Sequence, residues 1–290
     1  MKVLVTGANG NLGSKVVEYL LAKRSNEEII VGVRDNKSEK ARHFQAQGLE
    51  VRITNFDDQD TLLSAFKEID RLFLISTYGD LDTVMRHQTN AIKAAKANGV
   101  KKLFYPSIVN ADKNDFFLAV MHRAREKAII ESGIPYVILR NNWYVENELD
   151  KIQACIKGES WVTSAGNGKI GYVYRPDLAE ATANVLIADG HENKIYELSG
   201  NNITQQQYVD TVSEVTGKKI SLLEVDDATY EKMLKEAGVP EELIFLTIQS
   251  QKGIREGVLE ADHSDLTFLL ERQPTSLKEA LIELLVNTKE

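Results

Sequence analysis

Val5-Thr6-Gly7-Ala8-Asn9-Gly10-Asn11-Leu12-Gly13 joins the first apolar run of the chain, residues 3–5, to a helix-period stretch over residues 12–23. Glycines at this spacing let the backbone turn tightly after a strand and approach a phosphate closely. The helix that follows offers free N–H groups and the positive end of its dipole to the same anion. Because strand, glycine loop and helix stand in this order, the segment predicts a dinucleotide pyrophosphate site.

The first half of the chain alternates short apolar runs with helix-period stretches. The apolar runs predict strands at residues 3–5, 29–33, 51–53, 72–75, 103–105 and 136–139. The stretches between them predict helices at residues 12–23, 38–47, 61–66, 81–98 and 116–131. This alternation is typical of right-handed βαβ units, so the predicted class is α/β, a Rossmann-type doubly wound parallel sheet. Its ligand crevice is expected at the carboxyl ends of the strands.

The alternation stops after Arg140. Residues 158–171 are rich in Gly, Ser, Thr and Asn, and a helix is expected to begin near Asp177 with that residue as its N-cap. An apolar run at 194–199 predicts a strand that returns to the sheet.

From Thr204 onward the pattern is mostly helical, with one further strand expected near residues 220–225. We therefore expect a nucleotide-binding Rossmann domain over residues 1–150, completed by the returning strand. A smaller, mostly helical C-terminal lobe over residues 151–290 is expected on the substrate side, with the two parts interleaved.

Composition narrows the class of protein. The chain has 290 residues, 43% of them hydrophobic, and a net charge of −8, which are ordinary values for a globular protein. No basic stripe suggests nucleic acid as a partner, and no apolar run reaches the length of a membrane span. The chain begins directly on a strand without a leader pattern, so a cytoplasmic protein is expected. An oligomer stays open, because no apolar stripe marks an interface.

Cysteine and histidine suggest no chemistry of their own. Cys155 is the only cysteine, which excludes a disulfide within the chain, and its helical context predicts an apolar packing position. The histidines are scattered without metal-ligand spacing, so no metal is predicted. They are His43, His87, His122, His191 and His263.

The end of the second predicted strand bears on the choice of cofactor. An acidic residue there usually binds the ribose hydroxyls of NAD, whereas this chain reads Val33-Arg34-Asp35-Asn36-Lys37. The planar guanidinium of Arg34 suits a 2′-phosphate, and Lys37 adds positive charge. NADP(H) is therefore the predicted cofactor, while Asp35, one place later, keeps NAD(H) open as an alternative.

The chain resembles the NmrA-like proteins among the atypical short-chain dehydrogenase/reductases, in the branch of the bacterial NAD(P)H:quinone oxidoreductases and triphenylmethane reductases. The glycine loop, Val33-Arg34, residues 139–147 and residues 191–198 carry this resemblance. The stretch 139–147 reads Leu-Arg-Asn-Asn-Trp-Tyr-Val-Glu-Asn and is the most specific of the four. The resemblance implies cofactor contacts from Gly7, Asn9, Gly10, Asn11, Leu12, Arg34, Asn55, Phe56, Ser76, Ser107 and Lys127.

One residue of the wider superfamily's catalytic set is missing. Its ordinary members resemble one another in pairing a serine with Tyr-x-x-x-Lys, where the tyrosine exchanges a proton with the substrate oxygen. This chain has Lys127, but Arg123 stands four residues earlier, and a guanidinium stays protonated. Reduction of aliphatic ketones and epimerisation of sugar nucleotides are therefore disfavoured.

A quinone needs less from the protein, because hydride addition leaves a delocalised phenolate that needs hydrogen-bond donors more than a strong acid. Lys127, Asn141 and Tyr144 are the candidate donors. Trp143 and Tyr144 form either an aromatic wall for a flat acceptor or packing between the lobes. The predicted function is an NADPH-dependent reductase of quinones or similar conjugated acceptors. The alternative is a non-catalytic redox sensor that binds NADP(H) and a protein partner.

Overall fold

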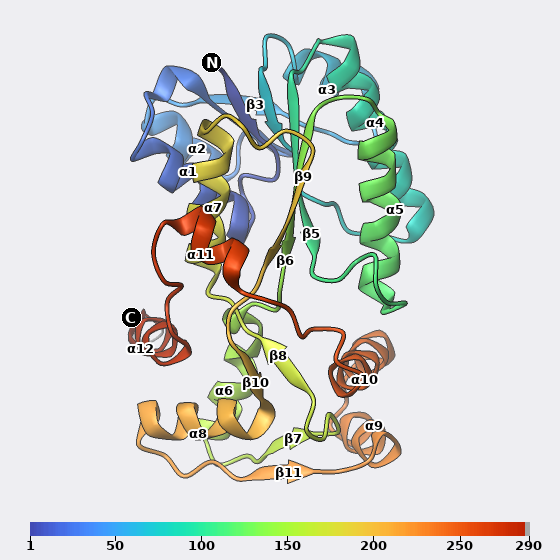
Figure 1. The fold of residues 1–290 in the computed structure, drawn as a ribbon, viewed down its shortest axis with the longest axis vertical. Helices are drawn as coiled ribbons and strands as arrows, with labels where there is room; N and C mark the ends of the chain where they lie inside the picture. The colour runs from blue at the N-terminus through green and yellow to red at the C-terminus, as the bar shows by residue number, and fades with distance from the viewer. Residues whose placement is uncertain (288–290) are drawn as a thin grey trace.

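Seven parallel strands form the central sheet of the protein, in the order β3-β2-β1-β4-β5-β6-β9 (Figure 1). The computed structural model describes residues 1–287. The strands are β1 (Val3–Val5), β2 (Ile29–Val33), β3 (Glu50–Ile53), β4 (Arg71–Phe73), β5 (Lys102–Ile108), β6 (Tyr136–Asn141) and β9 (Lys194–Leu198). All the strands predicted for the sheet are present, and the expected return of the chain is β9, which pairs with β6. The Rossmann-type fold is thus confirmed.

Helices cover both faces of the sheet because its strands alternate their side chains between two apolar cores. Val3 and Val5 of β1 lie in one core, and Leu4 lies in the other. The first core is covered by α1 (Asn11–Leu21), α2 (Glu39–Ala46), α7 (Arg175–Ile187) and α11 (Ser264–Leu270). The second is covered by α3 (Gln59–Ala65), α4 (Leu81–Ala97) and α5 (Phe117–Glu131). The 3-10 turn Asn26–Glu28 leads into β2.

The remaining elements form a smaller lobe below the carboxyl ends of the strands (Figure 1). Its helices are α6 (Leu149–Ile156), α8 (Gln205–Thr216), α9 (Asp227–Glu236), α10 (Glu241–Arg255) and α12 (Leu277–Asn287), after a 3-10 turn at Val145–Glu148. Its strands are β7 (Trp161–Thr163), β8 (Lys169–Gly171), β10 (Asn202–Thr204) and β11 (Leu222–Glu224). The buried rings of Trp161, Tyr172 and Tyr208 pack together at its centre.

The part of the chain after residue 150 differs from the sequence prediction in two respects. Strands β7, β8 and β10 were not expected, and they pair in two small sheets as β11-β7 and β10-β8. Helix α7 begins after an N-cap at Tyr174, so the prediction that Asp177 is the cap was wrong. Asp177 is instead buried inside the first turn, where it accepts hydrogen bonds from Thr275 and Arg272. The expected helix around Cys155 is α6, and the thiol is buried.

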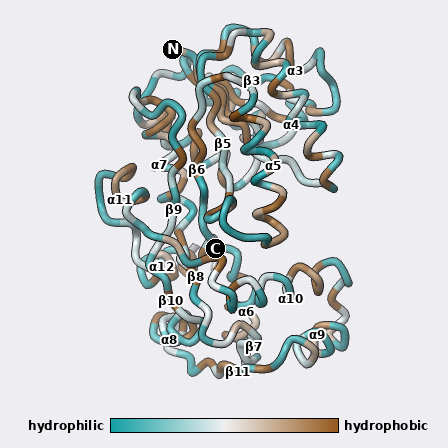
Figure 2. Tube along the Cα trace, turned by 45° about the vertical axis from the view of Figure 1, so that its right-hand side comes forward, coloured by the Kyte–Doolittle hydropathy of each residue, from teal (hydrophilic) through white to brown (hydrophobic). Residues whose placement is uncertain are grey.

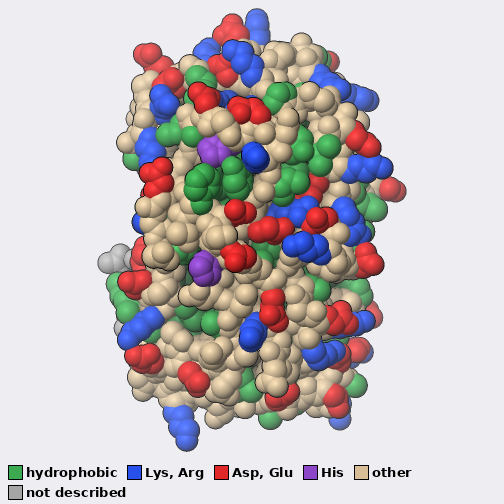
Figure 3. Space-filling model, in the orientation of Figure 1, with side chains coloured by type: hydrophobic (Ala, Val, Ile, Leu, Met, Phe, Trp, Pro, Cys, Tyr) green, Lys and Arg blue, Asp and Glu red, His purple; other side chains and the backbone are tan. Residues whose placement is uncertain are grey.

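The chain passes between sheet and lobe several times. Helices α7 and α11 and strand β9 come after residue 150 and still pack in the sheet layer. Hydrophobic segments run through the middle of this layer in Figure 2, where β5 and β6 lie at its centre. On the face drawn in Figure 3, acidic and basic side chains are interspersed rather than gathered by sign. Among residues 1–287, no helix is long and apolar enough to cross a bilayer.

Candidate cofactor and acceptor site

The glycine loop between β1 and α1 has the backbone geometry that a phosphate site needs. Gly7 has φ +59°, a left-handed conformation that glycine adopts without strain. A Cβ atom at Gly13 would lie 2.4 Å from the Gly7 carbonyl oxygen, so only glycine fits there. Gly10 is the N-cap of α1, no side chain caps the helix, and its first turn carries no acidic residue. The N–H groups at the start of α1 are therefore available to an anion, and the loop fits a dinucleotide.

A cavity of about 600 Å³ extends from this loop along the carboxyl ends of β4, β5 and β6. Gly7 and Gly10–Gly13 line one end, and α5 and the segment after β6 line the other. Eight of the predicted site residues line it together, namely Gly7, Gly10, Asn11, Leu12, Ser76, Ser107, Asn141 and Tyr144. The crevice thus lies where a doubly wound sheet is expected to bind its ligand.

Arg34 directly follows β2 and is exposed, beyond the cavity. The neighbouring Asp35 carboxylate accepts a hydrogen bond from the Lys37 backbone N–H at 2.8 Å, so a local turn already engages it. Lys40, which the sequence reasoning missed, donates from its Nζ to the Asn9 carbonyl oxygen at 2.8 Å. Cationic side chains therefore gather beside the strand end that recognises the adenosine ribose in Rossmann domains, which favours a 2′-phosphate.

Asn9 is held across this end of the site. Its Nδ2 donates to Ser38 Oγ at 2.9 Å, while its Oδ1 is buried without a partner among the described residues. Asn55 and Phe56 follow β3, whose Ile53 pairs with Val33 of β2. They therefore lie near Arg34 and outside the cavity described above. These placements fit an adenine side of the site, and the contacts themselves stay predictions.

The inner wall of the cavity holds a hydrogen-bonded chain of three side chains from the segment after β4, from β5 and from α5. Ser76 Oγ donates to the Tyr105 hydroxyl at 3.0 Å, and that hydroxyl lies 2.8 Å from His122 Nδ1. Burial raises the pKa of Tyr105 to about 12. Burial, aided by the nearby charge of Arg125, lowers the pKa of His122 to about 3, so this imidazole is neutral at physiological pH.

His122 lines the cavity, and the Tyr105 hydroxyl engages its Nδ1. A neutral imidazole has one donor and one acceptor nitrogen. When the Tyr105 hydroxyl donates to Nδ1, the ring proton resides on Nε2, and the site then has a neutral N–H donor. Sequence reasoning gave His122 no role in the chemistry. Its partner Tyr105 is far away in sequence, and no local pattern indicated the contact.

Lys127 does not lie at the site, contrary to its predicted position beside the nicotinamide. Its side chain is 73% exposed, and its ammonium pairs with Glu131 at 3.7 Å. The physical reason is the phase of α5. Leu118, His122 and Arg125 recur every three to four residues and face the cavity, and Lys127 follows Arg125 by about 200° of helical rotation.

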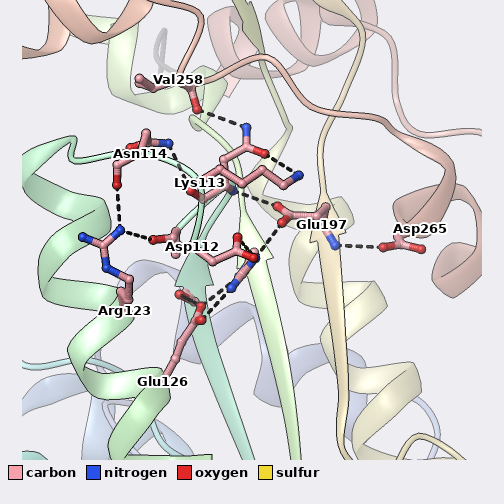
Figure 4. Close-up of polar contacts among 12 residues, drawn as sticks. Asp112, Lys113, Asn114, Arg123, Glu126, Glu197, Val258 and Asp265 are labelled. Atoms are coloured by element: carbon pink, nitrogen blue, oxygen red, sulfur yellow. Dashed lines mark hydrogen bonds and ion pairs between the residues drawn. The ribbon is translucent and has the colours of Figure 1, made fainter.

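Ser107 belongs to a buried ionic cluster at the end of β5. Its hydroxyl donates to Glu126 Oε1 at 2.5 Å, and both side chains of the pair are buried. Glu126 also receives two hydrogen bonds from Arg140, at 2.9 and 2.7 Å. Figure 4 shows Glu126 from α5, Glu197 from β9 and Asp112 directed at one place, where the Arg140 guanidinium binds all three carboxylates.

The same cluster attaches the C-terminal part of the chain to the sheet. Asn110 donates from its backbone N–H to Glu197 at 3.0 Å and from its amide to the carbonyl oxygens of Val258 and Glu260. Asn110 has φ +55°, a conformation that asparagine tolerates better than most residues. Ser107 is thereby fixed in place by contacts that extend well beyond the cavity.

Asn141 and Tyr144 meet at the acceptor side of the cavity. Asn141 Nδ2 donates to the Tyr144 hydroxyl at 3.2 Å, whereas Asn141 Oδ1 is buried without a partner among the described residues. Burial raises the pKa of Tyr144, so its hydroxyl keeps its proton at neutral pH. Beside them, Trp143 lines the cavity, donates from Nε1 to Glu148 at 3.0 Å and packs on the lobe core. Both of its predicted roles, wall and packing, are therefore compatible with its position.

Comparison with known proteins places this fold and site in a family. The NmrA-like family model matches residues 1–267. The chain belongs to the NmrA-like family. This NmrA-like protein is 35% identical over 283 residues to quinone oxidoreductase 2 of Escherichia coli (strain K12), and the match covers 97% of this chain and 98% of the relative. The family resemblance inferred from the sequence is therefore confirmed.

Two solved NmrA-like relatives superpose on the protein over nearly its whole length. Triphenylmethane reductase of Citrobacter sp., solved with NADP(H), has a TM-score of 0.92 at 34% identity and covers 98% of this chain and 99% of its own. The NADPH-dependent quinone oxidoreductase of Escherichia coli, solved with NADPH, gives the same TM-score, identity and coverage.

Proposed function

We propose that this protein is an NADPH-dependent reductase that transfers a hydride to quinones or similar conjugated acceptors. The observation that carries this proposal is the group of neutral polar atoms at the acceptor side of the cavity. These atoms are the protonated Tyr144 hydroxyl, the Asn141 amide and the ring of His122. When bound, NADPH supplies the hydride, and the chain's own residues orient both molecules and stabilise the negative charge that develops on the acceptor.

The glycine loop and α1 bind and orient the pyrophosphate, and the cations around Arg34 bind the 2′-phosphate. Asn141 Oδ1 needs a donor, and a ligand amide or hydroxyl in the cavity would satisfy it. Tyr144 and His122 donate to the reduced oxygen without having to ionise. Hydrogen bonds from neutral donors are enough for a quinone, because its reduced anion is delocalised. An aliphatic alkoxide, in contrast, requires a proton from an acid.

The relatives support this direction. One is named for quinone reduction and the other for triphenylmethane reduction, and both acceptor types are extended conjugated systems. The cavity, with Trp143 and Tyr144 on one side and Leu118 and Met121 on the other, offers the apolar and aromatic surfaces that such a flat molecule needs.

The decisive experiment is oxidation of NADPH by the purified protein, followed by its absorbance with and without 1,4-benzoquinone. We expect quinone-dependent turnover. In Arg34→Ala, kcat/KM for NADPH should fall about tenfold or more, because hydrogen bonds to charged groups contribute about 1.5–3 kcal/mol, while the value for NADH should change little. Arg24→Ala, an exposed arginine beyond the far end of α1, is the matched control and should behave like the wild type.

Absence of turnover in a protein that binds NADPH tightly would overturn the reductase proposal. A strong preference for one redox form of the cofactor, without turnover, would then support the redox-sensor alternative. Equal losses for NADPH and NADH in Arg34→Ala would contradict the assignment of Arg34 to the 2′-phosphate.

A further inference from the structure

Arg125 is a buried cation that the reaction described above does not use. It lies on α5, is 4% exposed and lines the cavity one turn after His122. Its guanidinium donates to the Thr77 carbonyl oxygen at 2.9 Å and contacts the Tyr105 hydroxyl. Both of these acceptors are neutral, and no carboxylate among residues 1–287 forms an ion pair with Arg125.

The contrast with Arg140 shows how unusual this is. Arg140 is equally buried, at 4% exposed, and three carboxylates surround it. A buried charge without a counter-ion is costly, because burial removes its hydration and two neutral hydrogen-bond acceptors replace that hydration only in part. An anionic ligand beside Arg125 would remove that cost.

The charge of the cavity wall points the same way. The chain as a whole carries a net charge of −8. Among the described residues that line the cavity, however, the charged side chains are Arg125 and Arg175, with no aspartate or glutamate. A cavity with such a lining attracts anions in an otherwise acidic protein.

The anions of the cofactor already have other partners. The pyrophosphate belongs to the glycine loop, and the 2′-phosphate belongs to the cluster around Arg34. The other cation of the lining, Arg175, already has partners of its own, because its guanidinium lies 5.0 Å from the centroid of the Tyr144 ring and close to the Glu146 carboxylate. Arg125 is on the opposite wall, on the same face of α5 as Leu118 and Met121. These two apolar side chains suit the body of a flat acceptor.

From these observations we infer that Arg125 binds an acidic substituent of the acceptor, so that the preferred substrates are conjugated acceptors carrying a carboxylate or sulfonate. This inference rests on the proposed reductase function and narrows its substrate class. The guanidinium presents planar, paired donors that match the oxygens of such a group. Arg125 is then a specificity-determining residue at the acceptor end of the cavity.

The test compares 1,4-naphthoquinone with 1,4-naphthoquinone-2-sulfonate as acceptors, with NADPH saturating. The measured quantity is the ratio of kcat/KM for the sulfonated over the neutral quinone. We expect this ratio to fall about tenfold or more in Arg125→Gln, mainly through KM for the sulfonate, and to be largely kept in Arg125→Lys, which retains the charge. Arg123→Gln is the matched control on α5 and should keep the wild-type ratio, since Arg123 does not line the cavity and donates instead to the carbonyl oxygens of Ala111 and Asn114 and to the Asp115 carboxylate.

A second arm measures binding without turnover. Naphthalene-2-sulfonate or neutral 2-naphthol is added to the NADPH complex, and the change in the fluorescence of bound NADPH gives the Kd of each. Loss of sulfonate binding in Arg125→Gln, with NADPH affinity kept, supports the inference. Equal effects on both quinones, or a matching loss of NADPH affinity, would overturn it and assign Arg125 to positioning or to the cofactor.

If the wild type reduces neither quinone, the reductase proposal fails. If the wild type reduces both quinones and the ratio is unaltered in Arg125→Gln, only the inference about Arg125 fails. Thermal denaturation of each variant identifies any that does not fold, in which case Arg125→Lys and the binding arm decide.

Discussion

The two ends of the cavity differ in the groups that form them, which are backbone groups at one end and side chains at the other. The phosphate end consists mostly of backbone, and at Gly13 an added Cβ atom would have no space. The acceptor end consists of side chains from the segment after β4 and from β5, β6 and α5, joined by hydrogen bonds. A site made of backbone loses its ligand altogether when an added side chain obstructs it. A site made of side chains changes its affinity gradually as single residues are substituted. Of the two solved relatives, one is named for triphenylmethane reduction and the other for quinone reduction, and both were solved with NADP(H) or NADPH.

The largest effect is expected at the phosphate end. In Gly13→Val the new Cβ would meet the Gly7 carbonyl oxygen at 2.4 Å and the Ala8 Cα at 3.0 Å, so the loop must open. We expect the Kd for NADPH, measured by fluorescence titration, to rise about a hundredfold or more. Gly99→Asn is the control, because Gly99 has φ +66° with open space around it and asparagine tolerates that conformation. Near-normal affinity in Gly13→Val would show that the loop is not the phosphate site.

At the acceptor end, an intermediate effect is expected from Asn141→Leu. The leucine keeps the volume of the buried side chain and removes both polar atoms, including the unpartnered Oδ1. We expect kcat/KM for benzoquinone to fall about tenfold to a hundredfold, as for the loss of one donor in an oxyanion site. Tyr144→Phe, which removes only the hydroxyl that Asn141 contacts, should lose less. An equal fall in NADPH affinity and in turnover would instead assign Asn141 to cofactor binding.

His122 tests whether the acceptor end affects stability as well as chemistry. Its pKa is about 3 in the folded protein and about 6.5 when unfolded, so the unfolded chain binds the proton more readily as the pH falls. The free energy of unfolding should therefore be fully retained above pH about 6.5 and fall below it, by at most about 1.4 kcal/mol per pH unit. Urea titrations across this window should show a shallower fall in His122→Asn. His43→Asn, on the exposed surface of α2, should follow the wild type. Identical slopes in all three proteins would contradict the burial of a neutral imidazole.

The smallest effect is expected from Lys127→Gln. Because the ammonium is exposed and, among residues 1–287, pairs with Glu131 alone, kcat/KM for benzoquinone should stay within about twofold of the wild type. The free energy of unfolding should change by no more than about 0.5 kcal/mol. A tenfold loss of activity would show that this side chain reaches the cavity, and that both faces of α5 contribute to the site.

The phosphate end is also the part that could be predicted from the sequence. The glycine loop is contiguous, and each glycine has a local steric reason that residue type alone indicates. The sheet strands followed from apolar runs, because parallel strands are buried on both faces. The three-residue strands β7, β8 and β10 were missed, because they are short and two of them lie in or beside a segment rich in Gly, Ser and Thr.

The acceptor end could be predicted only in part. Asn141 and Tyr144, which both line the cavity, could be selected because they stand at and just after the end of a strand that was itself predictable. On α5 the prediction selected Lys127 and passed over His122. The cause is that α5 buries two charged residues, Arg125 and Glu126, so apolar periodicity does not indicate which face is turned inward. The partners that stabilise them, Tyr105 and Arg140, come from other strands and have no local signature.

Strand β9 pairs with β6 but comes much later in the chain, which matters while the protein is being synthesised. Arg140 and Glu197 are separated by 57 residues, so on a ribosome adding about 5–20 residues per second the partner strand appears roughly 3–11 seconds after β6. During that interval the edge of β6 has unpaired backbone groups, which invite association with other chains. Of the three carboxylates that bind Arg140, those of Asp112 and Glu126 precede it in the chain, and only the Glu197 carboxylate has to come from β9. A charged residue on an edge strand is one of the devices by which proteins limit such association.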